Sequence, residues 1–185
     1  MTSSDKAGDL LAQIPKSQGL PPVHLWNPDF CGDIDMRIAR DGTWYYMGTP
    51  ITRPAVVRLF STIIRRDGEQ YFLVTPVEKV GIRVDDAPFV ITRMEVEGQG
   101  QTQCLRLFTQ VDDELLLDAE HPLRVSEHPH TGEPAPYVRV RSNLDGLVHR
   151  NVFYQMVDLS EPQELDGEVW FGVWSAGQFF ALGRP

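Results

Sequence analysis

Short segments in which apolar and polar residues alternate recur along this sequence of 185 residues. In residues 33–38, apolar side chains take every second position and charged side chains take the positions between. This two-residue period is typical of a strand with one buried face. Asp41-Gly42 then predicts a tight turn, and residues 43–46 have the aromatic content of a returning strand. The pattern favours a mainly antiparallel β protein. Further strands are expected over residues 70–74, 79–84, 89–97, 102–109, 114–117, 136–141, 168–175 and 178–182.

Three other segments have the apolar spacing of a helix. The first is short and covers residues 5–14. The second covers residues 52–64, with Thr52 as its N-cap. The third covers residues 142–156 and begins at Ser142, which forms a pattern close to a capping box with the aspartate three positions later. We expect these helices to pack beside the strands.

The order of these elements predicts the domain organisation. Residues 1–22 form an N-terminal helix and linker, residues 23–86 an N-terminal lobe, and residues 87–185 a C-terminal lobe. Two weak matches indicate a duplication. Asp41-Gly42-Thr43-Trp44 is followed by Pro50-Ile51, and Asp113-Glu114-Leu115-Leu116 is followed at the same spacing by Pro122-Leu123. We therefore expect an α+β fold of two related, mainly antiparallel β lobes, each with a helix.

The charge and the apolar runs restrict the partners. A formal net charge of −9 disfavours nucleic acid and anionic membranes, because like charges repel. No apolar run approaches the roughly 20 residues that span a bilayer, and residues 1–6 show no secretory signal. We therefore expect a cytoplasmic protein without a membrane partner. In that compartment Cys31 and Cys104 are expected to stay reduced and half-buried.

Several longer motifs are specific enough to compare with known families. They are Trp26-Asn27-Pro28, Cys31-Gly32-Asp33-Ile34-Asp35-Met36-Arg37-Ile38, Asp41-Gly42-Thr43-Trp44, Gly48-Thr49-Pro50-Ile51, Leu73-Val74-Thr75-Pro76-Val77-Glu78-Lys79-Val80 and Thr131-Gly132-Glu133-Pro134-Ala135-Pro136-Tyr137-Val138. Over almost the whole chain they resemble a bacterial family known only as domain-of-unknown-function family 1285. The resemblance implies two related α+β lobes, the second loosely similar to pleckstrin-homology-like domains. It suggests a binding role at the junction of the lobes, in signalling, and implies no reaction.

Signals of catalysis are weak. The sequence has no Gly-x-Ser-x-Gly elbow and no phosphate-binding glycine loop, and neither cysteine has a histidine and asparagine at a known catalytic spacing. Asp33 and Asp35 share a strand face about 7 Å apart, a separation that glycosidases use. Arg37 on the same face would keep both carboxylates ionised, so neither is an obvious proton donor. We predict no catalytic residue and no cofactor.

A metal site is the second possibility that the sequence raises. His128 and His130 could chelate along an extended strand, with Glu120, His121 and Glu127 close by in sequence. The prolines and the glycine of this segment indicate an exposed turn instead, and no second cluster of ligands completes a coordination shell. We therefore predict no metal ligand.

Arginines in this acidic chain are the remaining candidates, because arginine binds carboxylate or phosphate in a bidentate manner. The predicted ligand-binding residues are Asp35, Arg37, Arg53, Tyr137, Arg139 and Arg141. They are expected to line a groove between the lobes of a non-catalytic binding or regulatory module that takes a protein segment or an anionic ligand. Two alternatives stay open. The arginines could form salt bridges with Asp33, Asp35 or Glu78, or the groove could belong to an enzyme acting on a small polar substrate.

The same patterns predict the core, because each of nine residues falls on the apolar phase of its element. They are Trp44, Phe60, Ile63, Phe72, Val90, Leu107, Val140, Phe153 and Trp170.

Overall fold

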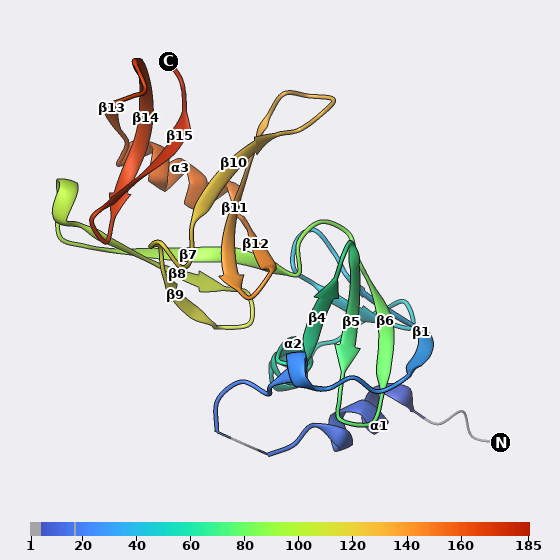
Figure 1. The fold of residues 1–185 in the computed structure, drawn as a ribbon. Coiled ribbons are helices and arrows are strands. Elements are labelled where there is room, and N and C mark those ends of the chain that lie inside the picture. The colour runs from blue at the N-terminus through green and yellow to red at the C-terminus, as the bar shows by residue number, and fades with distance from the viewer. Residues whose placement is uncertain (1–4, 17) are drawn as a thin grey trace. The chain divides into compact units, whose positions relative to one another are not determined.

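The chain divides between Asp86 and Ala87 into two units of similar architecture, seen here in a computed structural model (Figure 1). The structure describes residues 5–16 and 18–185. Residues 1–4, where no secretory signal was expected, and residue 17 of the expected linker lie outside the described residues.

The N-terminal unit is built on a six-stranded sheet. Its elements are α1 (Lys6–Gln13), the 3-10 turn η1 (Val23–Leu25), β1 (Phe30–Ile38), β2 (Trp44–Tyr46), β3 (Thr49–Pro50), α2 (Pro54–Ser61), β4 (Ile64–Asp67), β5 (Gln70–Val74) and β6 (Lys79–Val84). The strand order is β3-β2-β1-β6-β5-β4, and every neighbouring pair is antiparallel except the central pair β1 and β6.

The C-terminal unit contains a second six-stranded sheet and a smaller three-stranded one. Its elements are β7 (Phe89–Glu97), the 3-10 turn η2 (Gly100–Thr102), β8 (Cys104–Thr109), β9 (Glu114–Leu116), β10 (Leu123–Glu127), β11 (Pro134–Arg141), β12 (Leu144–Val148), α3 (Arg150–Asp158), β13 (Glu161–Leu165), β14 (Glu168–Ser175) and β15 (Gln178–Gly183). The large sheet has the order β10-β11-β12-β7-β8-β9, with β12 parallel to β7.

The two large sheets share one topology. In each, three antiparallel strands are followed by three more, and the last strand of the second set pairs in parallel with the first strand of the first set. The expected pair of related lobes is therefore present. The spacing match used to predict it was in the wrong register. In strand order, the turn at Asp41-Gly42 corresponds to the connection from β7 to β8, and Asp113 lies one turn later.

The second helix is shorter than its apolar spacing predicts. α2 begins at Pro54, its N-cap is Arg53 rather than Thr52, and Ile64 already belongs to β4. The turn at Gly68, which follows this segment, joins β4 to β5. The reason is long-range pairing: Ile64 lies opposite Leu73, and both are buried in the sheet. The N-terminal unit contains both of the helices expected before residue 86, α1 and α2.

The third helix begins eight residues later than predicted, at Arg150. Ser142 is not a cap but a turn residue in the left-handed region, with φ 50°. Residues 144–148 form β12, whose ladders with β11 and β7 outweigh the helical spacing. The cap of α3 is His149, whose Nδ1 accepts a hydrogen bond from the backbone N–H of Asn151 at 3.1 Å.

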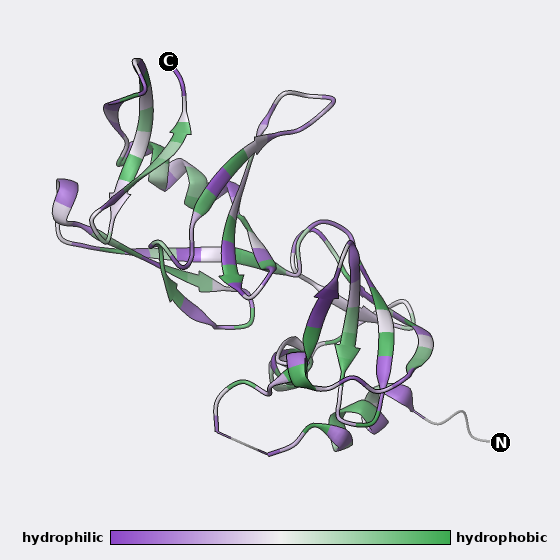
Figure 2. Cartoon of the chain, in the orientation of Figure 1, coloured by the Kyte–Doolittle hydropathy of each residue, from purple (hydrophilic) through white to green (hydrophobic). Residues whose placement is uncertain are grey.

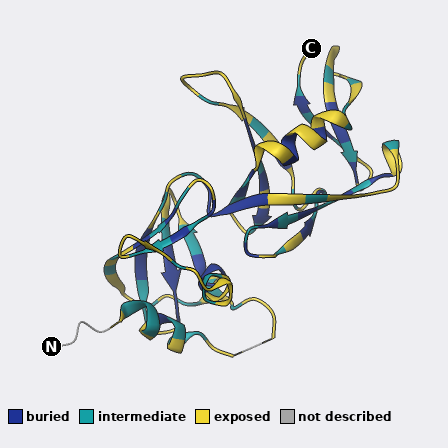
Figure 3. Cartoon of the chain, turned by 180° about the vertical axis from the view of Figure 1, so that it is seen from behind, coloured by how far each residue is buried: buried dark blue, intermediate teal, exposed yellow. Residues whose placement is uncertain are grey.

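Apolar residues follow the strands of each unit (Figure 2), and so do the buried positions (Figure 3). Eight of the nine predicted core residues are buried. The exception is Trp170, which is half-buried and has the guanidinium of Arg184 over its ring at 4.5 Å. Among the described residues, no helix is long and apolar enough to cross a membrane.

Candidate functional site

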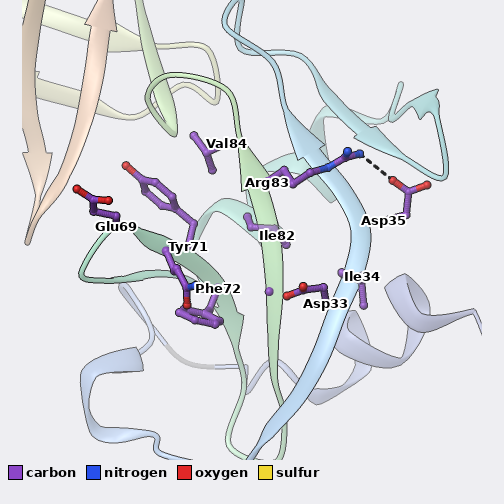
Figure 4. Close-up of a pocket in the computed structure, with 11 residues that line it drawn as sticks. Asp33, Ile34, Asp35, Glu69, Tyr71, Phe72, Ile82, Arg83 and Val84 are labelled. Carbon is purple, nitrogen blue, oxygen red and sulfur yellow. Dashed lines mark hydrogen bonds and ion pairs between the residues drawn. The ribbon is translucent and has the colours of Figure 1, made fainter.

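A cavity of about 640 Å³ opens on the sheet of the N-terminal unit (Figure 4). Strands β1, β5 and β6 and the turn before β5 supply its walls. The lining residues are Asp33, Ile34, Asp35, Glu69, Gln70, Tyr71, Phe72, Gly81, Ile82, Arg83 and Val84. A cavity of this size falls within the range of ordinary ligand sites.

Gly81 shapes the floor of this cavity. In the sheet it lies between Phe72 on β5 and Asp33 on β1. A Cβ atom added to Gly81 would lie 2.0 Å from Oδ1 of Asp33, so the missing side chain leaves the space that this carboxylate occupies. In the C-terminal unit, by contrast, Gly146 of β12 is closely packed by Val140 and Ile91. At Gly146 the space left by the missing side chain is filled by core residues, so no hollow forms there.

The cavity is lined by more acidic than basic side chains. Arg83 Nη2 donates a hydrogen bond to Asp35 Oδ1 at 3.1 Å, across from β6 to β1. Both side chains are well exposed, so this ion pair adds little stability. No described residue hydrogen-bonds or ion-pairs with the carboxylate of Asp33. With Glu69 included, three carboxylates face one guanidinium.

Phe72 forms an apolar wall with a firm support. Its ring is buried, with Lys79 Nζ at 4.2 Å from the ring centroid and the edge of Phe30 packed against it. Lys79 also pairs with Asp67 at 2.9 Å. The pKa of Asp67 is lowered, first by the hydrogen bond from Arg65 and then by the one from Lys79. This wall is therefore fixed by neighbours that do not themselves line the cavity.

Of the predicted binding residues in the N-terminal unit, Arg37 and Arg53 are not among those that line the cavity. Asp35 lines the cavity and pairs with Arg83. Arg37 points to a different partner, Asp85, and its guanidinium lies 4.6 Å from the ring centroid of Tyr45. Arg53 is exposed at the N-cap of α2. Arg83 was not predicted as a site residue. The alternation of residues 79–84 could have indicated it, because Arg83 takes an exposed position of that strand.

In the C-terminal unit, Tyr137 and Arg139 lie in one cluster with Arg124. Asp145 accepts hydrogen bonds from Arg139 at 3.3 Å and from Arg124 at 2.8 Å, and the Arg124 guanidinium lies 4.6 Å from the Tyr137 ring centroid. The sequence reasoning missed Arg124. The alternation of residues 123–127, read as a strand, would have placed it beside Tyr137.

Arg141 is a separate, mostly buried group. It pairs with Asp113 at 3.0 Å and lies 4.8 Å from the ring centroid of Phe89. Burial lowers its pKa, against the opposing effect of Asp113. Arg37, Arg139 and Arg141 each pair with an acid of their own unit. Glu78, one of the expected acids, pairs instead with Lys6.

The described residues contain no group of three or more histidine, cysteine or acidic side chains that could hold a metal ion. Cys31 and Cys104 are free thiols. Cys31 is exposed rather than packed, and its Sγ donates to the carbonyl of Asp29 at 3.2 Å.

Comparisons with known proteins give a consistent result. Residues 21–87 match the N-terminal domain of DUF1285, described as a domain of unknown function, and residues 88–182 match the C-terminal domain of the same family. The crystal structure of a DUF1285 family protein from Silicibacter pomeroyi DSS-3 is 55% identical, with a TM-score of 0.88 over 98% of this chain and 97% of that one. One from Shewanella baltica OS155 is 27% identical, with a TM-score of 0.52 over 66% of this chain and 90% of that one. No curated protein matches the chain.

Proposed function

The chain belongs to the DUF1285 family, and we propose that it is a non-catalytic binding and regulatory module whose N-terminal unit takes a protein segment in the cavity beside Gly81. The observation that carries this proposal is the cavity itself. It is a hollow of about 640 Å³ in the face of a sheet, and its lining includes a glycine and a buried aromatic ring. A side chain of an approaching segment can enter this hollow, where the carboxylate of Asp33 lies over Gly81.

The chemistry of the lining supports binding over turnover. The described residues that line the cavity include no serine, threonine, cysteine, histidine or lysine. Asp35 and Arg37, which the competing enzyme hypothesis would use, are each held in an ion pair, with Arg83 and Asp85. Three carboxylates against one guanidinium also disfavour an anionic ligand at this place, because like charges repel.

We further propose that the module acts in the bacterial cytoplasm as part of a signalling system. The two free thiols support a reducing compartment. The bacterial sources of the two similar crystal structures support the kind of organism.

The test is a selection of peptides from a displayed random library on the immobilised full-length protein, repeated with Gly81→Val. Valine suits an extended backbone, but its side chain would displace the carboxylate of Asp33 and take that space in the hollow. We expect the enriched peptides to lose binding to Gly81→Val and to retain it with Gly183→Val. Gly183 is the matched control because it also lies in a strand and an added Cβ there meets no atom within 4 Å.

Thermal melts of both variants establish that they are folded. The proposal fails when no peptide is enriched, or when enriched peptides bind Gly81→Val as well as the original protein. Turnover of a small polar substrate that is lost in Asp35→Ala would instead establish the enzyme hypothesis.

A further inference from the structure

We infer that the side chain received by this cavity is cationic, a lysine or an arginine whose charged group binds Asp33. The inference rests on the proposed function and specifies its partner: the protein segment carries a basic residue at the position that faces Gly81. Three features of the described residues lead to this assignment.

The first feature is the state of the charges. Arg83 neutralises Asp35 within the cavity, whereas no described residue pairs with Asp33. The carboxylate of Asp33 therefore keeps all its acceptor capacity for a ligand. A carboxylate binds an ammonium or guanidinium group through hydrogen bonds about twice as strong as those between neutral groups.

The second feature is the position of that carboxylate. Asp33 Oδ1 lies over Gly81, at a point only 2.0 Å from where a Cβ atom would be. The side chain of Asp33 is exposed, and its carboxylate is part of the lining of the cavity (Figure 4). A charged group of a ligand can therefore reach this carboxylate from solvent.

The third feature is the wall opposite. Phe72 lies across Gly81 from Asp33, and together with Ile34 and Ile82 it forms the apolar part of the lining. Lysine and arginine have long aliphatic stems that pack along apolar surfaces while the charged end reaches a polar group. The two walls therefore match the two parts of one basic side chain. Lys79, on the Phe72 ring, shows that this ring already tolerates a neighbouring cation.

The test uses the full-length protein and three synthetic hexapeptides, in which threonine alternates with arginine, with glutamate or with leucine. Binding is followed through the backbone amide NMR signals of Gly81 and Arg83. We expect the arginine peptide to shift these signals and the glutamate peptide to leave them unchanged. Added salt should weaken the binding of the arginine peptide, because salt screens the attraction between opposite charges.

Asp33→Asn is the decisive variant, since it removes the charge and keeps the size of an exposed side chain. We expect this variant to bind the arginine peptide with an affinity about tenfold lower or more. The matched control is Asp112→Asn, which changes the net charge equally but lies in the C-terminal unit, at a φ of 65° that asparagine tolerates. It should leave the affinity unchanged.

The outcomes separate the two proposals. Binding of the leucine peptide that disappears in Gly81→Val, with no preference for arginine, would refute the cationic partner and leave the binding module standing. Arginine binding that Asp33→Asn does not weaken, or a preference for the glutamate peptide, would also refute the inference. Peptides that never perturb the signals of Gly81 and Arg83 would overturn both proposals.

Discussion

Phe60 of α2 is fully buried, and its ring stacks on that of Trp44 with 6.2 Å between centroids and 12° between planes. Truncating a buried phenylalanine removes its burial energy and leaves a cavity. The preceding residue, Leu59, is 46% exposed on the same helix. The two neighbours therefore separate packing in the core from any general effect on α2.

We expect Phe60→Ala to lower the free energy of unfolding by about 3–5 kcal/mol. Leu59→Ala should change it by no more than about 0.5 kcal/mol, as surface substitutions usually do. Urea unfolding at one pH measures both values. Equal losses in the two variants would mean that α2 does not bury the face assigned to it.

At the scale of elements, α1 is held to the sheet by polar contacts around one buried leucine, Leu10. Lys6 pairs with Glu78, next to β6, and Thr75 donates to Gln13 Oε1 at 2.8 Å. The hydrogen bond from Lys6 is the main cause that lowers the pKa of Glu78 below its ordinary 4.5, and the same bond raises the pKa of Lys6 above 10.5.

These directions determine the pH window of the contact. A carboxylate with a lowered pKa stabilises the fold above its ordinary pKa, and the contribution is lost as the pH falls through the lowered value. A lysine with a raised pKa contributes below its ordinary pKa, and that contribution is lost as the pH rises through the raised value. The Lys6–Glu78 pair therefore stabilises the docking of α1 between the two ordinary values, 4.5 and 10.5.

We accordingly expect Glu78→Gln to be less stable than the original protein in urea at about pH 7, and the difference to shrink at about pH 3. Glu120→Gln, at an exposed glutamate of the C-terminal unit, serves as the control and should show no such difference. A deficit of Glu78→Gln that is as large in acid as at neutral pH would contradict the assigned ion pair.

At the scale of the molecule, each unit completes its own six-stranded sheet and buries its own apolar residues. The parallel pair at the centre of each sheet joins the unit's first strand to one near its end. A unit therefore needs both of its three-stranded halves to fold, but it does not need strands of the other unit.

We expect residues 1–86 and residues 87–185, produced separately, each to unfold cooperatively in urea and to give well-dispersed amide NMR signals. Residues 1–68 form the control, because this fragment lacks β5 and β6 and leaves β1 without its central partner. The control should be unfolded. Failure of both complete fragments to fold would show that the division at Asp86 does not separate independent units.

Local sequence signals were sufficient for strands bounded by turn-forming residues. The ranges predicted for β5, β6 and β7 agree with the structure, because alternation and flanking turns both act over a few residues. The Asp41-Gly42 hairpin follows for the same reason, and Gly42 takes the positive φ that such a turn requires. The edge strand β13 was missed because its residues are nearly all exposed and lack an apolar period.

For the site, sequence reasoning reached Asp35 but not the cavity around it. The alternation of residues 33–38 correctly placed Asp33, Asp35 and Arg37 on the polar face of one strand. It could not show that Arg83 would neutralise Asp35, or that Asp33 would lie over a glycine, since those residues are 48 positions apart in each case. The sequence also could not separate the arginines proposed in the C-terminal unit, where Arg139 lies in a surface cluster and Arg141 is mostly buried.

Local sequence patterns are sufficient to identify the apolar residues, the places where the chain can turn and the segments that can be strands. Contacts between distant segments are needed for residues 144–148 to form β12 rather than a helix, and for β1 to lie beside β6. The physical reason is the range of the interactions. Turn and burial preferences belong to neighbouring residues, whereas a parallel ladder exists only after distant strands have met, and the hollow between Asp33, Gly81 and Phe72 is made by that meeting.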